Sequence, residues 1–267
     1  MIIVGELINS TRKKIKEAME KNDSEYIRNL AIKQDEAGAD FIDVNAGAFV
    51  YDEIEKLAWA INEIQDVTKK PLAIDSPRVE AMAMGLKLHK NGKPMINSIT
   101  KESERWEQVF PLAVETPALV LGLCIDDNGI PDEADDRVKI ADHIINDLVK
   151  GGKNIQDIAI DPLTTPLSVN TTYGMTVINT IKGVKKNFPD VKLITGLSNI
   201  SYGLPSRKQV NRAFMVSCMV NGLDGALIDP LDSVMMSIIF ATEAILNKDP
   251  YCGNFLKAYR KGLVVKE

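Results

Sequence analysis

The chain alternates short apolar runs with longer segments of helical period, and this alternation, repeated eight times, constrains the fold more than any other feature. The predicted strands are residues 2–6, 40–45, 71–75, 94–97, 118–124, 157–161, 192–199 and 225–229. Each is a continuous apolar run, as is typical of parallel strands that are covered on both faces. Eight such units in 267 residues match a single (β/α)8 TIM barrel, so we expect an α/β fold of that class.

The spacing of the units gives no sign of a second domain. A doubly wound sheet would show the same alternation, but no GxGxxG turn follows the first strand, so dinucleotide binding has no support. No Gly-, Ser- or Pro-rich linker interrupts the chain. We therefore expect one domain over 1–267, with a short helical extension at about 250–267 whose Phe255 and Tyr259 could cover an end of the barrel.

Charge and hydropathy argue against several classes of function. The 32 basic and 37 acidic residues give a net charge of −5 and are interspersed, so we expect no nucleic-acid partner. The N-terminal apolar run is broken at Glu6 and does not look like a signal peptide. Because no apolar stretch reaches the roughly 18 residues of a membrane span, we expect a soluble, cytoplasmic protein with no membrane partner.

Two further patterns bear on packing and assembly. Cys124, Cys218 and Cys252 have neither disulfide nor metal-site spacing, so we expect them to be small buried apolar residues. Residues 234–246 are apolar on nearly every side, which predicts either a fully buried helix or a subunit interface, and we favour a homodimer.

Polar side chains close seven of the eight predicted strands, and in a barrel of this type active sites gather at that end. Any one of them could simply cap a helix or close a turn. Together they predict a ring of carboxylates and amides around one bowl, with almost no cation in it. The closing residues are Glu6, Asp43 with Asn45, Asp75, Asn97, Asp161, Asn199 and Asp229.

The remaining residue types exclude several chemistries. A Schiff-base lysine has no candidate, because Lys192 begins its strand instead of ending it. A zinc hydrolase needs more histidine than His89, expected near a helix end, and His143, expected on the surface. Neither a GxSxG elbow nor a P-loop occurs.

Two ligands remain for such a ring. Carboxylates and amides suit the hydrogen-bonding edge of a nitrogen-rich heterocycle such as a pterin. Mg²⁺ on Asp43, Asp75 and Asp161 is the alternative, and it ranks lower because enolate chemistry would also need a lysine base. We therefore expect no metal at the site.

The motifs VGELIN, DFIDVNAG, LAIDSP, MINS, IDPL and GLSNIS, in this order, resemble the pterin-binding methyltransferases. That family includes the methyltetrahydrofolate:corrinoid/iron-sulfur protein methyltransferases and the folate module of cobalamin-dependent methionine synthase. Dihydropteroate synthase shares the barrel more distantly. The similarity runs from residue 2 to about residue 260, and the ordered set is far more specific than any one motif.

The resemblance implies roles for individual residues of this chain. Asp75, Asn97 and Asp161 would grip the pyrimidine edge of the pterin, and Asn199 would be the catalytic residue beside the methyl-carrying nitrogen. The other implied substrate-binding residues are Gly196 and Ser198 on the floor, Arg207 near the folate glutamate or exposed to solvent, and Tyr202. Tyr202 begins a stretch that departs from the acetogen enzymes, at the rim where a corrinoid protein would dock.

The implied reaction moves a methyl group, in either direction, between tetrahydrofolate or methyltetrahydrofolate and the cobalt of a corrinoid. No DxHxxG signature is present, so the corrinoid (cobalamin) would come on a partner protein and would not be bound permanently. One alternative is a dihydropteroate synthase-like condensation, which places a lysine near the GLSN segment, whereas residues 196–200 carry no cation here. The other is a non-catalytic folate-binding subunit.

Overall fold

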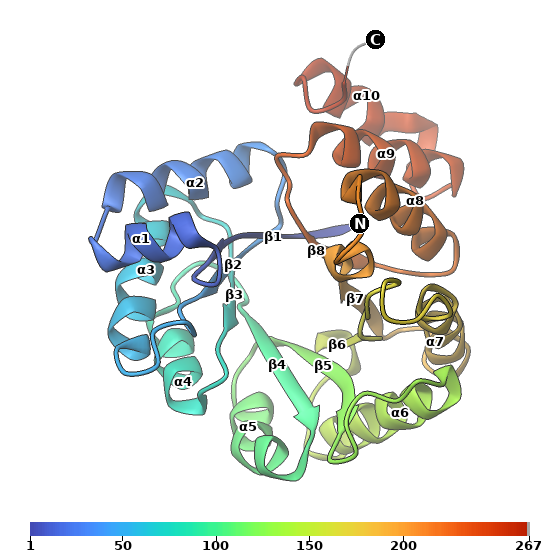
Figure 1. Ribbon diagram of the computed structural model, residues 1–267, viewed down its shortest axis with the longest axis horizontal. Helices are drawn as coiled ribbons and strands as arrows, with labels where there is room; N and C mark the ends of the chain where they lie inside the picture. The colour runs from blue at the N-terminus through green and yellow to red at the C-terminus, as the bar shows by residue number, and fades with distance from the viewer. Residues whose placement is uncertain (266–267) are drawn as a thin grey trace.

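In residues 1–265, which this computed structural model describes, eight parallel strands close into a barrel surrounded by helices (Figure 1). The strands pair in chain order, and β1 closes the ring against β8. They are β1 (Ile2–Asn9), β2 (Phe41–Asn45), β3 (Leu72–Asp75), β4 (Met95–Lys101), β5 (Leu119–Asp126), β6 (Ile158–Asp161), β7 (Lys192–Gly196) and β8 (Gly225–Ile228). The expected (β/α)8 barrel is confirmed.

The helices form the outer layer and pack apolar side chains against the strands. They are α1 (Lys13–Glu20), α2 (Ser24–Glu36), α3 (Glu53–Val67), α4 (Val79–Leu88), α5 (Ser103–Glu115), α6 (Ala134–Lys150), α7 (Tyr173–Asn187), α8 (Arg207–Val220), α9 (Ser233–Ile245) and α10 (Gly253–Arg260). Short 3₁₀ turns are η1 (Ile155–Asp157), η2 (Leu197–Ser201) and η3 (Pro250–Cys252). Ile61 of α3, Ile74 of β3 and Met82 of α4 are fully buried in this outer core.

A second, smaller core fills the inside of the barrel. Its buried members are Val4, Ala73, Met95, Leu119, Leu121, Ala159 and Ile194, and Ile2, Phe41, Leu123 and Leu227 pack against them. Because strand side chains alternate between the two faces, the residue two positions further along each strand also faces the barrel axis. These next positions lie at the carboxyl ends of the strands and therefore form the floor of the barrel mouth.

The ends of five predicted strands differ from the structure. β4 and β5 continue to Lys101 and Asp126, so Asn97 lies inside β4 and does not close it, and β8 ends at Ile228, one residue before Asp229. The other two are β7 and β1. β7 ends at Gly196, and the predicted strand residues Leu197 to Asn199 lie in η2, so the prediction that Asn199 closes a strand is wrong. β1 continues beyond Glu6 to Asn9. Its pairing with β2 shifts register between Gly5 and Ile8, and the buried Gln34 Oε1 of α2 accepts a hydrogen bond from Leu7 N at 3.1 Å. A side chain thus satisfies a strand N–H at the bulge.

The C-terminal helices lie at the outer edge of the ring (Figure 1). α10 packs on α9 and buries Ala258, whereas Tyr259 is 44% exposed, so the aromatic pair does not form a lid over the barrel. The predicted extension reached 267, but residues 266–267 lie outside the described chain. α9 is not fully buried, because Ile245 is 82% exposed.

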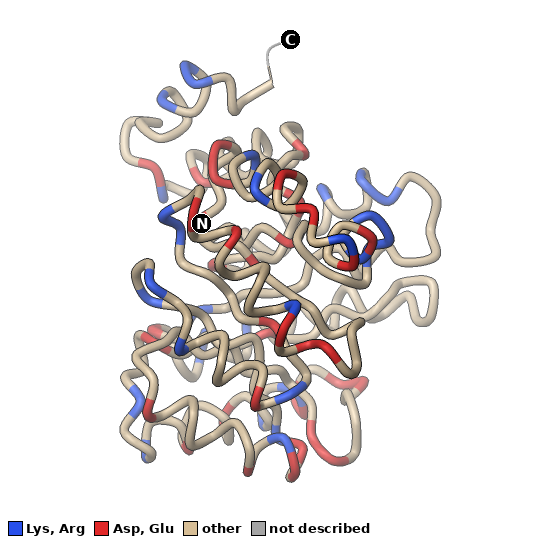
Figure 2. The backbone as a smooth tube through the Cα atoms, turned by 90° about the vertical axis from the view of Figure 1, so that its left-hand side faces the viewer, with Lys and Arg blue, Asp and Glu red and all other residues tan. Residues whose placement is uncertain are grey.

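Several other expectations can be compared with the described residues. Cys124 and Cys218 are buried as expected, but Cys252 is exposed, since it lies in the turn before α10. His89 follows the end of α4, and His143 is exposed. Basic and acidic residues are interspersed in the view of Figure 2. Within residues 1–265, no helix is both long and apolar enough to cross a membrane.

Candidate active site at the barrel mouth

A layer of polar side chains lies directly above the inner core. Each of its members stands two residues after an inner-core residue, and for the five members within strands alternation turns the side chain toward the barrel axis. We call this set the polar layer: Glu6, Asp43, Asp75, Asn97, Asp161 and Asp229. The sixth, Asp229, directly follows β8 and lies close enough to Glu6 for the two carboxylates to repel each other. On β7 the equivalent position is Gly196, which leaves that side of the floor open. Carboxylates and an amide from separate strands therefore converge, as the sequence predicted.

One half of the polar layer comes from β2, β3 and β4. Asn97 Nδ2 donates a hydrogen bond to Asp43 Oδ1 at 3.1 Å, and both side chains are buried. Asp75 lies in register with Asn45 on one side and Asn97 on the other. Asn45 is itself fixed, because its Oδ1 accepts from Ser10 Oγ at 3.1 Å and from the next loop's backbone. Neighbouring strands thus hold these groups edge to edge.

Burial and mutual repulsion change the acidity of this half. Burial and the nearby Asp75 carboxylate raise the pKa of Asp43 well above its usual range. Burial also raises the pKa of Asp75 to about 6, although a hydrogen bond from Asn45 and the charge of Arg105 oppose the rise. At neutral pH, Asp75 is therefore the ionised acceptor of the pair, and Asp43 holds its proton far more readily than a free aspartic acid does.

The other half is built around Asp161 at the end of β6. Its Oδ1 accepts from Thr195 Oγ1 at 2.7 Å and from Leu163 N at 2.8 Å, and its Oδ2 accepts from Gly196 N at 3.2 Å. Burial raises the pKa of Asp161, while these hydrogen bonds lower it. Oδ2 has a single partner and keeps more free capacity to accept a hydrogen bond from a ligand.

Gly196 brings Asn199 close to Asp161. A Cβ atom at Gly196 would lie 3.7 Å from Asn199 Nδ2, and the Gly196 N–H contacts Asp161 directly. Asn199 is exposed, and within residues 1–265 its amide has no hydrogen-bond partner. Its donors and its acceptor are therefore available to a ligand at the mouth.

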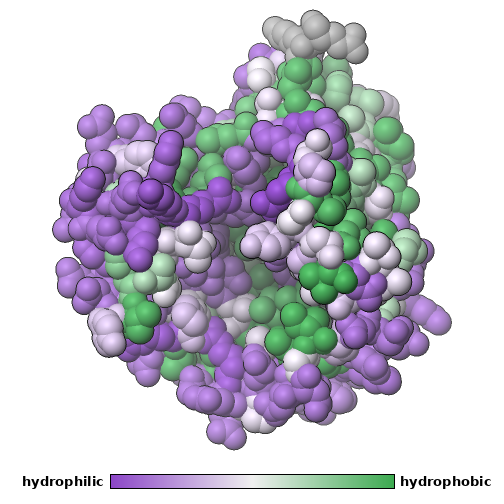
Figure 3. Space-filling model, in the orientation of Figure 1, coloured by the Kyte–Doolittle hydropathy of each residue, from purple (hydrophilic) through white to green (hydrophobic). Residues whose placement is uncertain are grey.

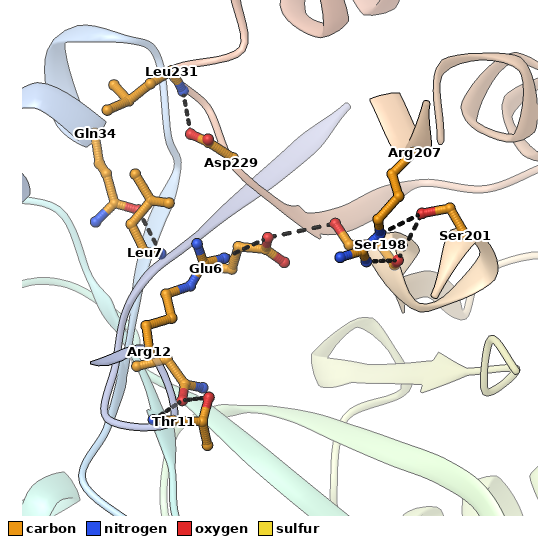
Figure 4. A network of polar contacts seen from close by, with 11 residues as sticks. Glu6, Leu7, Thr11, Arg12, Gln34, Ser198, Ser201, Arg207, Asp229 and Leu231 are labelled. Carbon is orange, nitrogen blue, oxygen red and sulfur yellow. Dashed lines mark hydrogen bonds and ion pairs between the residues drawn. The ribbon is translucent and has the colours of Figure 1, made fainter. Parts of the chain in front are cut away.

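Polar contacts join η2 to β1 and α8 (Figure 4). Ser198 Oγ donates to Glu6 Oε1 at 3.4 Å, and Arg12 pairs with the same carboxylate at 2.8 Å. Arg207 donates to Ser198 O at 2.8 Å and to Ser201 Oγ at 3.0 Å, so its guanidinium points back onto η2. Tyr202 N donates to Asn199 O at 3.0 Å, and the Tyr202 ring is exposed on the rim. The turn that carries Asn199 is thus fixed at several points.

A hollow of about 590 Å³ opens beside the first half of the polar layer. It is lined by Thr11, Asn45, Gly47, Ala48, Asp75, Ser76, Pro77, Asn97, Ser98, Thr100, Glu102 and Arg105. A recess near the centre of the face in Figure 3 shows hydrophilic and hydrophobic side chains meeting there. Asp161, Ser198 and Asn199 lie across the mouth and do not line this hollow. Its volume is in the range of small-molecule sites.

Two arginines at the barrel mouth were not predicted from the sequence. Arg105 lines the hollow and donates to Ser76 O at 2.9 Å and to Pro77 O at 2.7 Å, and Arg12 pairs with Glu6. The expectation of almost no cation was therefore wrong. Both arginines lie outside the strands, and only their position in the first residues after β1 and β4 could have indicated them.

The side chains of this set can form hydrogen bonds to a polar, largely neutral ring. Ionised carboxylates accept from adjacent N–H donors, and amides both donate and accept. Within residues 1–265, no three His, Cys, Asp or Glu side chains come together in a way that could hold a metal ion. The Mg²⁺ alternative therefore gains no geometric support from Asp43, Asp75 and Asp161.

Comparison with known proteins agrees with this chemistry. The family described as "Pterin binding enzyme" matches residues 5–229, which include the whole polar layer. The chain belongs to the pterin binding enzymes. Among curated members, the methylcorrinoid:tetrahydrofolate methyltransferase of Eubacterium limosum is 37% identical over 268 residues, which cover 99% of this chain and 98% of that protein.

Two other matching proteins are less similar to this chain. The methionine synthase of Mycobacterium tuberculosis is 30% identical over 241 residues, which cover 85% of this chain but 20% of that protein. A dihydropteroate synthase from Xanthomonas albilineans, solved in complex with 7,8-dihydropteroate, superposes with a TM-score of 0.69 at 16% identity, over 93% of this chain and 92% of that one. At that identity the likeness supports the fold alone.

Proposed function

We propose that this protein is a methyltransferase that moves a methyl group between tetrahydrofolate and the cobalt of a corrinoid on a partner protein. The observation that carries the proposal is the polar layer, placed at the mouth of a pterin binding barrel that matches a methylcorrinoid:tetrahydrofolate methyltransferase along its whole length. The layer has the acceptors that a pterin edge needs, and the hollow beside it has room for a ring.

The proposed pterin contacts follow from the free hydrogen-bonding capacity at the mouth. Asp75 and Asp161 accept from adjacent ring N–H groups, and Asn97, held by Asp43, meets a ring atom with its oxygen. Strands position all of these groups, so little conformational entropy is lost when the substrate binds. Burial and the Asp75 carboxylate raise the pKa of Asp43, which favours its neutral form beside Asp75.

Asn199 is the proposed catalytic residue. The methyl-carrying nitrogen changes its charge during transfer, and a free amide can follow that change by donating or accepting a hydrogen bond. Arg207 holds the backbone of η2 and so keeps the amide in place, which supports a bracing role more directly than a contact with the folate glutamate. The corrinoid supplies the cobalt that gives or takes the methyl group, and the chain contributes proximity and electrostatics.

The partner surface is proposed at the rim of the mouth. Tyr51, Val169 and Tyr202 are exposed large residues in the loops after β2, β6 and β7, all on the same end of the barrel. A corrinoid protein that brings cobalt to Asn199 has to cover this rim. We further propose that the protein acts in the cytoplasm as a homodimer, and the exposed Ile245 on α9 supports an interface on that helix.

The test is incubation with tetrahydrofolate and methylcobalamin, or with methyltetrahydrofolate and reduced cobalamin, while the visible spectrum of the cobalt is recorded. We expect a protein-dependent change in at least one direction. Folate binding without any spectral change would support a non-catalytic folate-binding subunit instead. Condensation of a pterin diphosphate with p-aminobenzoate is not expected, because residues 196–200 carry no cation and Arg207 is engaged with η2.

A further inference from the structure

Arg137 is a buried cation that lies next to the site but does not enter it. It stands in the first turn of α6, and none of its surface is exposed. A buried guanidinium loses its hydration, so it persists only where other groups compensate. Backbone carbonyls accept from its Nε and Nη1 atoms, whereas the buried Nη2 has no hydrogen-bond partner within residues 1–265.

Three of these carbonyl contacts converge on two loops. Arg137 Nε donates to Pro131 O at 2.7 Å, and Nη1 donates to Pro162 O at 2.8 Å and also to Leu163 O. Pro162 and Leu163 directly follow Asp161, the last residue of β6. The guanidinium therefore holds the turn that leaves the end of that strand.

The same turn determines where the Asp161 carboxylate points. Leu163 has a left-handed backbone with φ of 59°, which is unfavourable for a branched side chain and needs support from its surroundings. In that conformation Leu163 N donates to Asp161 Oδ1 at 2.8 Å. Leu163 therefore links the two side chains: its carbonyl accepts from Arg137, and its N–H donates to the Asp161 carboxylate.

We propose that Arg137 is a positioning residue for Asp161: it fixes the turn at residues 161–163 so that the carboxylate stays aimed at the pterin edge. This inference rests on the proposed function, because Asp161 is the group through which Arg137 acts. It assigns a binding role to a residue that has no exposed surface with which to touch the substrate.

Lys153 offers a matched control just beyond the same helix. It follows the other end of α6, is also buried, and donates from Nζ to Ala113 O at 3.0 Å and to Thr116 O at 2.8 Å. These carbonyls lie at the end of α5 and just after it, at the opposite end of the barrel from the polar layer. Removing Lys153 thus takes a side-chain donor from the buried Ala113 carbonyl, as removing Arg137 does from its carbonyls, but far from Asp161, while Thr116 O still accepts from Ala118 N.

The experiment compares Arg137→Met, Arg137→Lys and Lys153→Met with the wild-type protein. Thermal melts report stability, and titration with tetrahydrofolate reports the dissociation constant. We expect both Met variants to melt at lower temperature, because each removes the side-chain donor of at least one buried carbonyl. Only Arg137→Met should weaken folate binding, by about tenfold, and Arg137→Lys should weaken it by about threefold because it keeps the charge but not the fork.

The outcomes separate this inference from the proposed function. If the wild-type protein binds no folate, the proposed function is wrong, and this inference is wrong with it. If the wild-type protein binds folate and both Arg137 variants that fold bind it equally well, the inference alone is wrong. Should Arg137→Met fail to fold, Arg137→Lys decides. Equal weakening in Lys153→Met would also overturn the inference, because a general loss of stability would then explain the effect.

Discussion

Replacing Asp161 by Asn changes one atom of the site and should separate substrate binding from folding. The Asp161 Oδ1 atom accepts two hydrogen bonds, at 2.7 and 2.8 Å, whereas Oδ2 accepts one at 3.2 Å. An asparagine therefore keeps its oxygen at the first position and puts its NH₂ group at the second. That NH₂ faces the Gly196 N–H and, in the complex, the pterin N–H donors.

The effect on folding should be small because two changes oppose each other. The variant loses the bond from Gly196 N, and a neutral backbone bond contributes about 0.5–1.5 kcal/mol. Burial raises the pKa of Asp161 above its unfolded value of 3.8, so the ionised carboxylate costs folding free energy above that pH. A neutral amide removes this cost at pH 7. We expect the melting temperature to change by less than about 4 °C.

The effect on binding should be large because nothing offsets it. Oδ2 is the oxygen with free capacity, and a hydrogen bond to a charged group contributes about 1.5–3 kcal/mol. Losing it weakens folate affinity by about 10- to 150-fold. The Asn NH₂ group also places a hydrogen-bond donor against the pterin N–H donor. We therefore expect a loss of affinity near the upper end of this range.

The assay pairs calorimetric titration of tetrahydrofolate with a thermal melt of the same sample. Asp40→Asn is the matched control, because Asp40 Oδ2 also accepts a backbone bond, from Ile3 N at 2.8 Å, but at the opposite end of the barrel. We expect the control to bind folate as the wild-type protein does. Wild-type affinity in Asp161→Asn, or an equal loss in Asp40→Asn, would refute the reasoning.

Three other predictions test separate parts of the site. Asn199→Ala should slow methyl transfer about 100- to 1,000-fold in single-turnover experiments while folate affinity changes little, and an unchanged rate would exclude the catalytic role. In the proposed complex an ionised Asp75 accepts hydrogen bonds from the pterin, and its pKa is about 6, so folate affinity should fall as the pH drops through about 6. Asp75→Asn should lose this pH dependence in titrations from pH 5 to 8. Arg105→Met removes a charge that lowers the pKa of Asp75, so the fall should begin at higher pH; an unmoved profile would contradict the assignment.

The sequence predicted the barrel and most of the polar layer for one physical reason. An apolar strand that ends in Asp or Asn can be recognised from a few consecutive residues, and parallel strands bring such ends to one rim. Asp75 and Asp161 end their strands as predicted. Asn199 could not be placed the same way, because the apolar run continues through Leu197 while the backbone turns into η2.

The contacts of two arginines could not be predicted from the sequence. Arg105 and Arg137 bind backbone carbonyls, and a carbonyl acceptor has no residue-type signature. Each contact depends on how a helix start meets a loop from a neighbouring strand. The expectation of a bowl with almost no cation was wrong for that reason, because the motifs identify the strand ends but not the helix starts beside them.

The most direct test of the central claim is to follow the methyl group itself. A corrinoid protein carrying a ¹³C-methyl group on cobalt would be mixed with tetrahydrofolate and this protein, and the ¹³C signal recorded by NMR. We expect the signal to move to the pterin nitrogen at a rate that depends on this protein and is lower in Asn199→Ala. A signal that stays on cobalt while tetrahydrofolate is bound, together with no transfer from ¹³C-methyltetrahydrofolate to reduced corrinoid, would contradict it.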